Sequence, residues 1–591
     1  MNNHILIKTA LVGLGAFAFA GCVNPDVIDQ KMLTRYQEQM AKTSPQARVD
    51  NTAQGKLGLL QPPGAPNSPT LKIVKNAEGK ATIPLSLEET IMRTLANSLD
   101  IRVTSFDPEI NRQEVIKAAA EFDYIMFGGF NWGKQNNAVN STIGGGRVDT
   151  TGYNAGVRQK TITGAEQQIA WTQTRTRDNT SSLVKPFQPA WEDTLVYQVR
   201  QPLLRNGWPE FNLAQMHIAQ VNLKISNAQF RQKVEETVNE VISTYWLLIQ
   251  TRRDLYIQDA LLRRTQETAA RMAMRHDIDA TKVQLKQTEA AVESRRAVLI
   301  RIKKNIMDTQ DKLARLMNDK EMNLISEYEI IPTTPPITEL VKLDIADQLL
   351  TGLRYNPVLE QARLAIEGAA INVKVAENQA LPRIDFIGSA GLQGLDQSAS
   401  EANTMLRYAD HANYTAGIEA EYPIGNRQRL ADLSAKRFSY LKSITDMQNT
   451  ADQLGLLIRE RIRQVQTSHD EMLAQRSATD AAQAQLDALE ATEKFRGTMD
   501  PAFLQVKLQA QETLANAQRA EVQAIMDYNS SMADLSRVTG TTLELQRVRI
   551  AMPVVMEEQA WPKKQPKEEP SDYLKGILKS TSMPEASGNS K

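Results

Sequence analysis

The chain has 591 residues, of which 41% are hydrophobic, and its 69 Lys and Arg residues balance 69 Asp and Glu residues. Zero net charge argues against a nucleic-acid-binding protein, which needs a basic excess. After the N-terminus, no stretch approaches the roughly 20 apolar residues of a membrane-spanning helix. One cysteine and five histidines allow no internal disulfide framework and leave little for a metal cluster. These counts argue against a polytopic helical transporter, a zinc enzyme and a disulfide-built domain.

The N-terminus has the pattern of an export signal. An apolar run ends at Phe19, and the small residues Ala20 and Gly21 stand directly before Cys22. This order is similar to a bacterial lipobox, in which Cys22 would become the acylated first residue of the mature chain and anchor it in a membrane. The alternative is a plain signal peptide with an incidental cysteine. We expect residues 1–22 to be a lipoprotein signal peptide.

The rest of the chain divides into a linker, two halves with similar sequence patterns, and a tail. The offset from Pro202 to Pro423 is 221 residues, and the offset from Met317 to Val538 is also 221 residues. Equal offsets over such a distance indicate a duplication. The predicted domains are the signal peptide 1–22, an extended linker 23–84, a first repeat 85–340, a second repeat 341–551 and a disordered tail 552–591.

Long helices are predicted to make up most of each repeat, over about 211–318 and about 427–540. Apolar residues recur there with the 3.5-residue period that is typical of a coiled coil. A helix of roughly 65 residues is about 95–100 Å long, which suits the width of a periplasm. Each half therefore forms an antiparallel hairpin with its turn at the far end. The seam residues are Val234, Val238, Val241, Tyr245, Leu248 and Leu255, then Leu299, Ile302, Ile306, Thr309, Leu313 and Leu316, and in the second half Leu454, Ile458, Ile462 and Val465.

Segments of alternating residues predict strands at the opposite end of each hairpin, within about 121–203 and about 382–424. Alternating segments of about ten residues bounded by turns are typical of membrane β-barrel strands. The first half has about forty extra residues here, which the alternation predicts to be an inserted hairpin. This hairpin either widens a barrel or projects outside the cell. The aromatic residues of the region are either girdles at a lipid boundary or ordinary core packing.

The strands of one chain are too few to close a barrel. An open sheet edge cannot lie in lipid, because its backbone N–H and C=O groups would lack hydrogen-bond partners. Several copies must therefore pool their strands into one closed sheet and their helix hairpins into one closed cylinder.

At this point the chain resembles the TolC-type outer membrane efflux protein family (outer membrane factors) over roughly residues 85–545. The resemblance implies a fold that is mainly α with membrane β, in two tandem repeats that each have a strand pair and a long helical hairpin. It also implies a homotrimer, with an α-barrel topped by a shared β-barrel. The matching motifs are LSLEE at 85–89, FDPEI at 106–110, QPLLRNG at 201–207, NQALPRIDF at 378–386, EYPIGNR at 421–427 and DYNSSMADLSRVTGT at 527–541.

The resemblance also implies a location and partners. The chain would lie in the bacterial cell outer membrane, lipid-anchored, in contact with outer membrane lipid, and would extend into the periplasm. Its partners would be a periplasmic adaptor protein, which meets the helix tips, and an inner-membrane transporter. No nucleic acid is expected.

The helix tips are the candidate gate, since a gated channel must narrow there. The family usually has a turn with glycine followed by an inward-facing Asp, whereas Lys282 takes the place of that acid in the first hairpin. If Arg275, Lys282 and Arg496 face the lumen, three-fold symmetry makes positive rings that favour anionic passengers. The alternative is that these cations are solvated or contact an adaptor. The candidate tip residues are Arg275, Asp277, Asp279, Lys282, Arg496, Gly497, Asp500 and Pro501.

No catalytic, cofactor-binding or metal-binding site is predicted. Residues 128–135 nearly form a phosphate-binding loop, but Gln135 replaces the magnesium-binding hydroxyl, and a strand end with an outer loop explains them better. His469 replaces an apolar seam residue and is expected to pack between helices.

The expected function is therefore the outer membrane channel component of a tripartite efflux or type I secretion system. Such a component would be a passive duct that is not an enzyme. The alternative is a non-conducting coiled-coil envelope lipoprotein or periplasmic adaptor. The transported substrate is not predicted.

Overall fold

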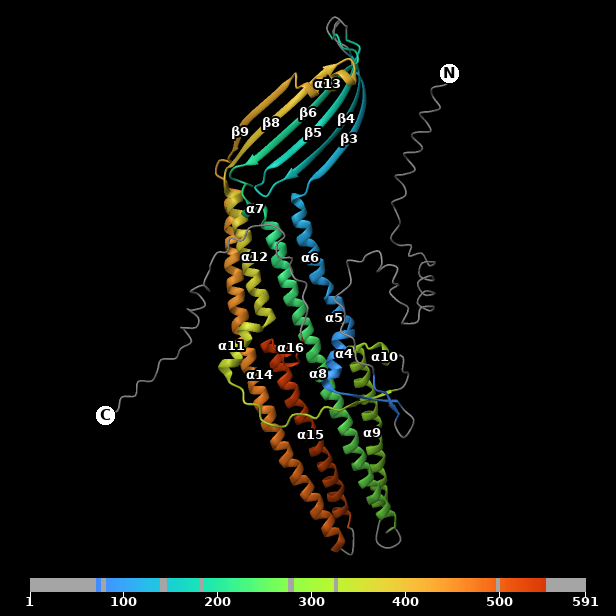
Figure 1. Ribbon diagram of the computed structural model, residues 1–591. Coiled ribbons are helices and arrows are strands. Elements are labelled where there is room, and N and C mark those ends of the chain that lie inside the picture. The colour runs from blue at the N-terminus through green and yellow to red at the C-terminus, as the bar shows by residue number, and fades with distance from the viewer. Residues whose placement is uncertain are drawn as a thin grey trace, which may run out of the picture. The chain divides into compact units, whose positions relative to one another are not determined.

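The computed structural model describes residues 71–75, 81–138, 146–180, 185–274, 281–323, 328–495 and 500–548. Its larger sheet has six strands in the order β3-β4-β5-β6-β8-β9, and every neighbouring pair is antiparallel (Figure 1). The inserted hairpin is β4 and β5, so it widens this sheet instead of projecting from it. The strands are β3 (Ile125–Asn136), β4 (Arg147–Lys160), β5 (Glu166–Asp178), β6 (Ala190–Pro202), β8 (Arg383–Asp396) and β9 (Ala412–Glu421).

Long helices continue from the sheet, as the 3.5-residue period predicts. The first hairpin is α8 (Ala214–Met274) with α9 (Lys282–Met317), and the second is α14 (Arg427–Phe495) with α15 (Pro501–Thr539). Their predicted seam residues are buried, except for Leu255, which is half-buried. His469 is buried and packs edge-on against Tyr528, as expected.

The helices form a wall in which shorter helices complete the row beside the long ones. Near the sheet α8 packs between α6 (Phe106–Ala119) and α12 (Pro357–Ala380), and α12 packs against α14 (Figure 1). Farther along, α8 packs between α9 and α15, and α15 packs against α14. The wall is therefore four helices wide at both levels. The remaining helical segments of the described chain are α4 (Leu87–Asn97), α5 (Leu99–Thr104), η1 (Ala120–Phe122), α7 (Pro209–Asn212), α10 (Lys320–Asn323), α11 (Ile345–Tyr355), α13 (Ala399–Tyr408) and α16 (Thr542–Leu545). Of these, α13 packs on strands β6 and β8 of the larger sheet and does not belong to the wall.

The duplication is visible where each long hairpin ends. Asn318 ends α9 and Gly540 ends α15, both in the left-handed conformation and 222 residues apart (540 − 318). Asn318 donates a hydrogen bond to the carbonyl of Asn97 at the end of α4. In the second repeat, Gly540 lies so close to Tyr355 at the end of α11 that a Cβ would come within 2.5 Å of its carbonyl oxygen. The repeats share this junction, but only the second requires glycine for space.

A second, three-stranded sheet was not expected from the sequence. It contains β1 (Val74–Lys75), β2 (Ala81–Leu85) and β7 (Tyr328–Pro332), and β2 and β7 are parallel. The end of the segment predicted as a linker is thus a paired strand. Tyr245 of α8 fixes this sheet, since its hydroxyl donates to the Leu85 carbonyl at 3.0 Å and accepts from the backbone N–H of Thr334 at 3.0 Å.

Candidate channel site

The strand register gives the six-stranded sheet two chemically different faces. Residues directly opposite each other on neighbouring strands point to the same face, and alternate residues point to opposite faces. One face, here called the polar face, has the cross-strand rows Asn154–Thr172–Thr194–Gln393 and Arg158–Gln168–Gln198–Ser389–Thr415. The other, here called the apolar face, has the rows Gly128–Ala155–Trp171–Leu195–Leu392–Ala412 and Met126–Val157–Ile169–Tyr197–Ala390–Tyr414.

Large side chains on the apolar face are open to solvent in the single chain. Met126 is 83% exposed, Phe130 is 64% exposed and Tyr414 is 80% exposed. Soluble proteins rarely expose apolar residues that lie side by side over a whole sheet. One face therefore suits contact with lipid, and the other suits contact with water.

Ion pairs hold the polar face together where the strands join the helices. The carboxylate of Asp385, which is 3% exposed, accepts from Arg200 at 2.8 Å and from Arg383 at 2.9 Å. Arg200 also pairs with Glu419, and Arg383 with Glu421. These contacts connect β6, β8 and β9, so the outermost strand β9 is fixed to the sheet by side chains as well as by its backbone.

Both edges of this sheet lack a neighbouring strand within the described chain. β3 is one edge and β9 the other, and every residue of β9 is exposed. Tyr414 and Ile418 of β9 lie on the apolar face and are 80% and 72% exposed. Both edges have backbone groups free to pair with another chain.

At the other end of the helices, the structure describes part of the predicted gate. Lys282 is the first residue of α9 and is exposed, next to Thr281, whose side chain forms a capping box with Gln284. Asp500 caps α15 by accepting from the backbone N–H of Phe503 at 2.7 Å, and Pro501 occupies the first turn, where its missing N–H costs no hydrogen bond. The remaining predicted residues lie outside the described ones, namely Cys22, Arg275, Asp277, Asp279, Arg496 and Gly497.

A carboxylate near this tip joins three helices. Glu493, in the last turn of α14, pairs with Lys507 of α15 and with Arg271 of α8, the latter at 3.3 Å. The Lys507 side chain is 3% exposed and that of Glu493 is 14% exposed. The sequence could not identify this junction, because Arg271 and Glu493 lie in different repeats. We call Glu493, Lys507 and Arg271 the tip clamp.

A second polar contact follows along the same helices. Arg295 of α9 donates to the Leu508 carbonyl of α15 at 3.2 Å, and Gln511 of α15 donates to the Thr268 hydroxyl of α8 at 3.2 Å. Burial lowers the pKa of the Arg295 guanidinium. An apolar cluster packs beside these contacts, mostly on the side of the helix turns, and includes Met272, Phe503, Leu504 and Leu508. The helix ends are therefore joined by two successive polar contacts and by this apolar cluster.

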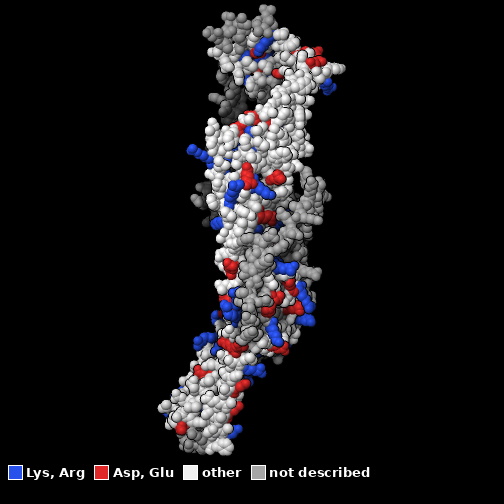
Figure 2. Space-filling view, turned by 90° about the vertical axis from the view of Figure 1, so that its left-hand side faces the viewer, with Lys and Arg blue, Asp and Glu red and all other residues white. Residues whose placement is uncertain are grey.

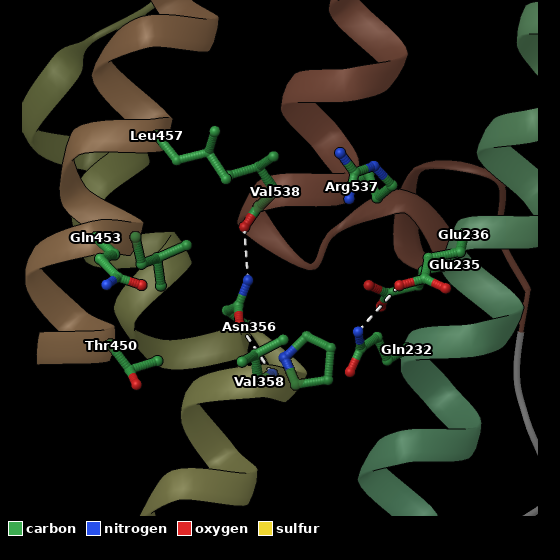
Figure 3. A pocket seen from close by; sticks show the side chains of 12 residues that line it. Gln232, Glu235, Glu236, Asn356, Val358, Thr450, Gln453, Leu457, Arg537 and Val538 are labelled. Carbon is green, nitrogen blue, oxygen red and sulfur yellow. Dashed lines mark hydrogen bonds between the residues drawn. The ribbon is translucent and has the colours of Figure 1, made fainter. Parts of the chain in front are cut away.

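A pocket of about 200 Å³ lies where α8, α12, α14 and α15 meet, and Figure 3 shows its lining. Asn356 fixes one side by donating to the Val538 carbonyl at 2.8 Å, and Gln232 fixes the other by donating to Glu236 at 2.9 Å. Glu235, which is 1% exposed, also lines it. No local sequence pattern identifies this pocket, since its residues come from both repeats.

Glu235 is a buried acid with a displaced pKa. Burial raises the pKa of its carboxyl to about 7, against the opposing effect of Arg231, which donates to it at 3.0 Å. Arg537 of α15 also lowers this pKa, and Glu544 of α16 raises it. Arg231 donates in turn to the Gly540 carbonyl at 2.7 Å, so the protonation of Glu235 is coupled to the end of α15.

Other kinds of site find no support in the described part of the chain. No group of three His, Cys, Asp or Glu side chains there is placed to hold a metal ion. Residues 128–135 lie entirely within strand β3 and make no phosphate-binding loop, and the outer loop that was expected to begin among them begins only after Asn136. None of the described helices is long and apolar enough to cross a membrane.

Comparison with known proteins agrees with these features. Residues 352–541 match the family model of the outer membrane efflux proteins. The structure is similar to the outer membrane channel CmeC of Campylobacter jejuni, with a TM-score of 0.55 and 14% identity over 77% of this chain and 86% of that chain. It is also similar to the outer membrane protein VceC of Vibrio cholerae, with a TM-score of 0.56 and 16% identity over 77% and 96% of the two chains. For the MtrE outer membrane channel of Neisseria gonorrhoeae the TM-score is 0.56, with 15% identity over 77% and 89%.

No curated protein sequence matches the chain. The family match falls in the second half, and the likeness in fold covers both halves. Together they confirm the resemblance to the TolC-type outer membrane efflux family, including the mainly helical fold with a sheet and two repeats.

Proposed function

We propose that this chain, whose second half matches the outer membrane efflux proteins, is the outer membrane channel component of a tripartite efflux or type I secretion system. It would act as a passive homotrimeric duct across the periplasm and the outer membrane. The pump supplies the energy, and the chain supplies a water-filled path and performs no catalysis.

The observation that carries the proposal is the six-stranded sheet with two open edges and two unlike faces. A β-sheet in lipid must be closed, since each unpaired backbone group costs several kcal/mol there. If β9 of one copy pairs with β3 of the next, the edges disappear and the ring closes head to tail. The apolar face then meets lipid and the polar face lines the pore, which is the arrangement of membrane β-barrels.

The helical wall supports the same assembly. On one side α14 exposes Phe438 (71%) and Leu441 (55%), and on the other α6 exposes Ile110 (59%) and Ile116 (54%). Figure 2 looks onto the side with β9 and α14, where uncharged surface separates scattered groups of charged side chains. Joining α14 of one copy to α6 and α9 of the next would bury these residues and close the cylinder.

The location follows from the same proposal. Cys22 would be lipidated, would become the first residue of the mature chain once the residues before it are removed, and would hold the chain at the outer membrane. The helix tips would extend into the periplasm, where an adaptor engages them and an inner-membrane transporter hands over the passenger. Arg275, Lys282 and Arg496 would form positive rings at the narrowest part.

The rival function is a non-conducting coiled-coil envelope lipoprotein or a periplasmic adaptor. An adaptor normally has one helical hairpin inside small β domains, whereas this chain has two hairpins and a wide amphipathic sheet. A coiled-coil protein outside the membrane has no need for an exposed apolar sheet face.

Planar bilayer recording tests the proposal. Purified full-length chain should form pores, and Lys282→Asp should shift the reversal potential under a salt gradient toward cation selectivity. Lys117→Asp, on an exposed lysine of α6 near the sheet and away from the helix tips, is a matched control. A lack of conductance in the unchanged chain and in variants of Arg275, Lys282 and Arg496 would reject the duct. An unchanged reversal potential in Lys282→Asp would reject its lumenal position alone.

A further inference from the structure

Basic side chains gather on the apolar face at the end of the sheet that lies away from the helices. The first row there pairs Asn136 with Arg147, and the next contains Lys134, Asp149 and Arg177. Arg175 follows one row closer to the helices. Since alternate residues share a face, all four cations point to the side that carries the apolar rows. We call Lys134, Arg147, Arg175 and Arg177 the rim cluster.

The rim cluster has more cations than its neighbouring acids can neutralise. Asp149 pairs with Arg147 at 3.5 Å. Asp396, on the same row as Arg175 and Trp191, accepts from the backbone N–H groups of Gln397 and Ser398. A third acid of this face, Asp193, is fully buried and accepts from Asn403 of α13. Among the described residues of this face, four cations therefore lie beside two accessible carboxylates in each copy.

Aromatic side chains separate the rim cluster from the uncharged rows. Trp132, which is 68% exposed, and Trp191 lie on the row of Arg175, whose guanidinium carbon is 5.8 Å from the centre of the Trp191 ring. Phe130 and Tyr153 occupy the next row, with their rings 5.2 Å apart. Aromatic residues of this kind lie at the boundary between hydrocarbon and headgroups in membrane proteins.

We propose that the rim cluster binds the phosphate groups of an anionic glycolipid in the outer leaflet, lipid A being the chemical type. This inference rests on the proposed function, because it requires the apolar face to lie in a membrane. In that position the aromatic row lies at the level of the headgroups and the cations lie just above it. Arginine forks match phosphate oxygens in a bidentate manner, and three of the four cations are arginines.

The cations of the polar face differ from those of the rim cluster in how their charge is balanced. Its cations near the helices, Arg200 and Arg383, are bound to carboxylates on the same face. Their charge is therefore used within the protein, whereas that of the rim cluster is only partly matched. Headgroup phosphates on the outer side of the sheet would supply the missing negative charge.

Lipid retention tests the proposal on full-length chain in neutral detergent. Bisphosphorylated lipid A is added, the excess is removed, and the lipid retained per chain is counted by mass spectrometry. The variant Lys134→Gln/Arg175→Gln/Arg177→Gln should bind lipid A at least roughly tenfold more weakly, since each cation at an anionic membrane surface contributes roughly fivefold to binding. A matched control removes three exposed helix cations by Lys117→Gln/Arg296→Gln/Lys304→Gln and should keep full retention.

Two further measurements distinguish phosphate binding from other causes of a change in lipid retention. Lipid A without phosphates should bind the unchanged chain as weakly as the bisphosphorylated form binds the rim variant. Equal retention by the rim variant and the unchanged chain, or equal binding of the two lipids, would overturn the proposal. Bilayer conductance of the rim variant is measured in parallel, so that loss of the duct function is recognised independently of lipid binding.

Discussion

Glu235 is the residue whose chemistry the fold changes most clearly. Its pKa is raised to about 7 from an ordinary 4.5, so the folded chain holds this proton more tightly than the unfolded chain does. The free energy of unfolding should therefore fall as pH rises from about 4.5 to about 7 and stay level above that. Glu235→Gln should remove this dependence and stabilise the chain at pH 8 by roughly 3 kcal/mol. Thermal unfolding of both proteins at pH 5 and pH 8 measures this pH dependence.

Glu236 is the control for this prediction, because it is the neighbouring acid and is exposed. Glu236→Gln should leave the pH dependence intact. A pH profile of Glu235→Gln that parallels that of the unchanged chain would show that Glu235 is already ionised in the folded chain. Burial and three charged groups from three helices together determine the pKa of Glu235. No sequence spacing around residue 235 therefore predicts the raised pKa.

Among the elements, the tip clamp decides how firmly three helices are joined. Glu493→Gln leaves the buried Lys507 ammonium without a carboxylate, and losing one partner of a buried pair typically costs roughly 3–5 kcal/mol. It also frees Arg271 of α8. We expect faster hydrogen exchange at the ends of α14 and α15 and a higher open probability in planar bilayers.

Two companion variants identify the cause. Glu493→Gln combined with Lys507→Met removes both buried charges, so it should restore stability while the link to Arg271 stays broken. Asp487→Asn alters an exposed acid that accepts a hydrogen bond from Gln483 of the same helix, and it should change neither exchange nor opening. If Glu493→Gln leaves both measurements unchanged, the clamp does not restrain the tip.

The same elements show what sequence patterns reveal and what they miss. The seam of α8 through Val238 and Val241 is predictable, because a periodic local pattern is enough to define a buried helix face. α14 begins at Arg427, where the predicted helical tract of the second half begins, for the same reason. The pairing of β2 with β7 joins strands more than 240 residues apart, and neither strand alternates strongly enough to reveal its partner. The tip clamp likewise depends on which helices become neighbours.

At the scale of the whole molecule, the inserted hairpin sets the width of the proposed barrel. The second repeat contributes two strands and the first contributes four, so β4 and β5 raise the count from four to six in each copy. Barrel diameter grows roughly in proportion to strand number. The insertion was predictable from the unequal spacing of the two repeats, but its place in the sheet depends on strand pairing that the sequence alone left open.

Deleting the hairpin should therefore narrow the duct at its outer end without opening the sheet. β3 and β6 run in opposite directions, so Asn136 can be joined to Trp191 through an Asn-Gly turn once residues 137–190 are removed. Asn136 and Trp191 both lie on the apolar face, and this junction keeps every side chain of β3 and β6 on its original face. The barrel diameter should fall by about one third. The size of the largest polyethylene glycol that enters the pore from the sheet side measures this diameter.

The polymer size cut-off depends on the side of the pore to which the polymer is added. Polymers added at the helix tips should show the same cut-off for both proteins, because the deletion leaves α8, α9, α14 and α15 unchanged. A smaller cut-off on the sheet side alone assigns β4 and β5 to the barrel wall. An unchanged cut-off on that side would mean that the assembled pore closes without these two strands, and six strands per copy would then overstate its circumference.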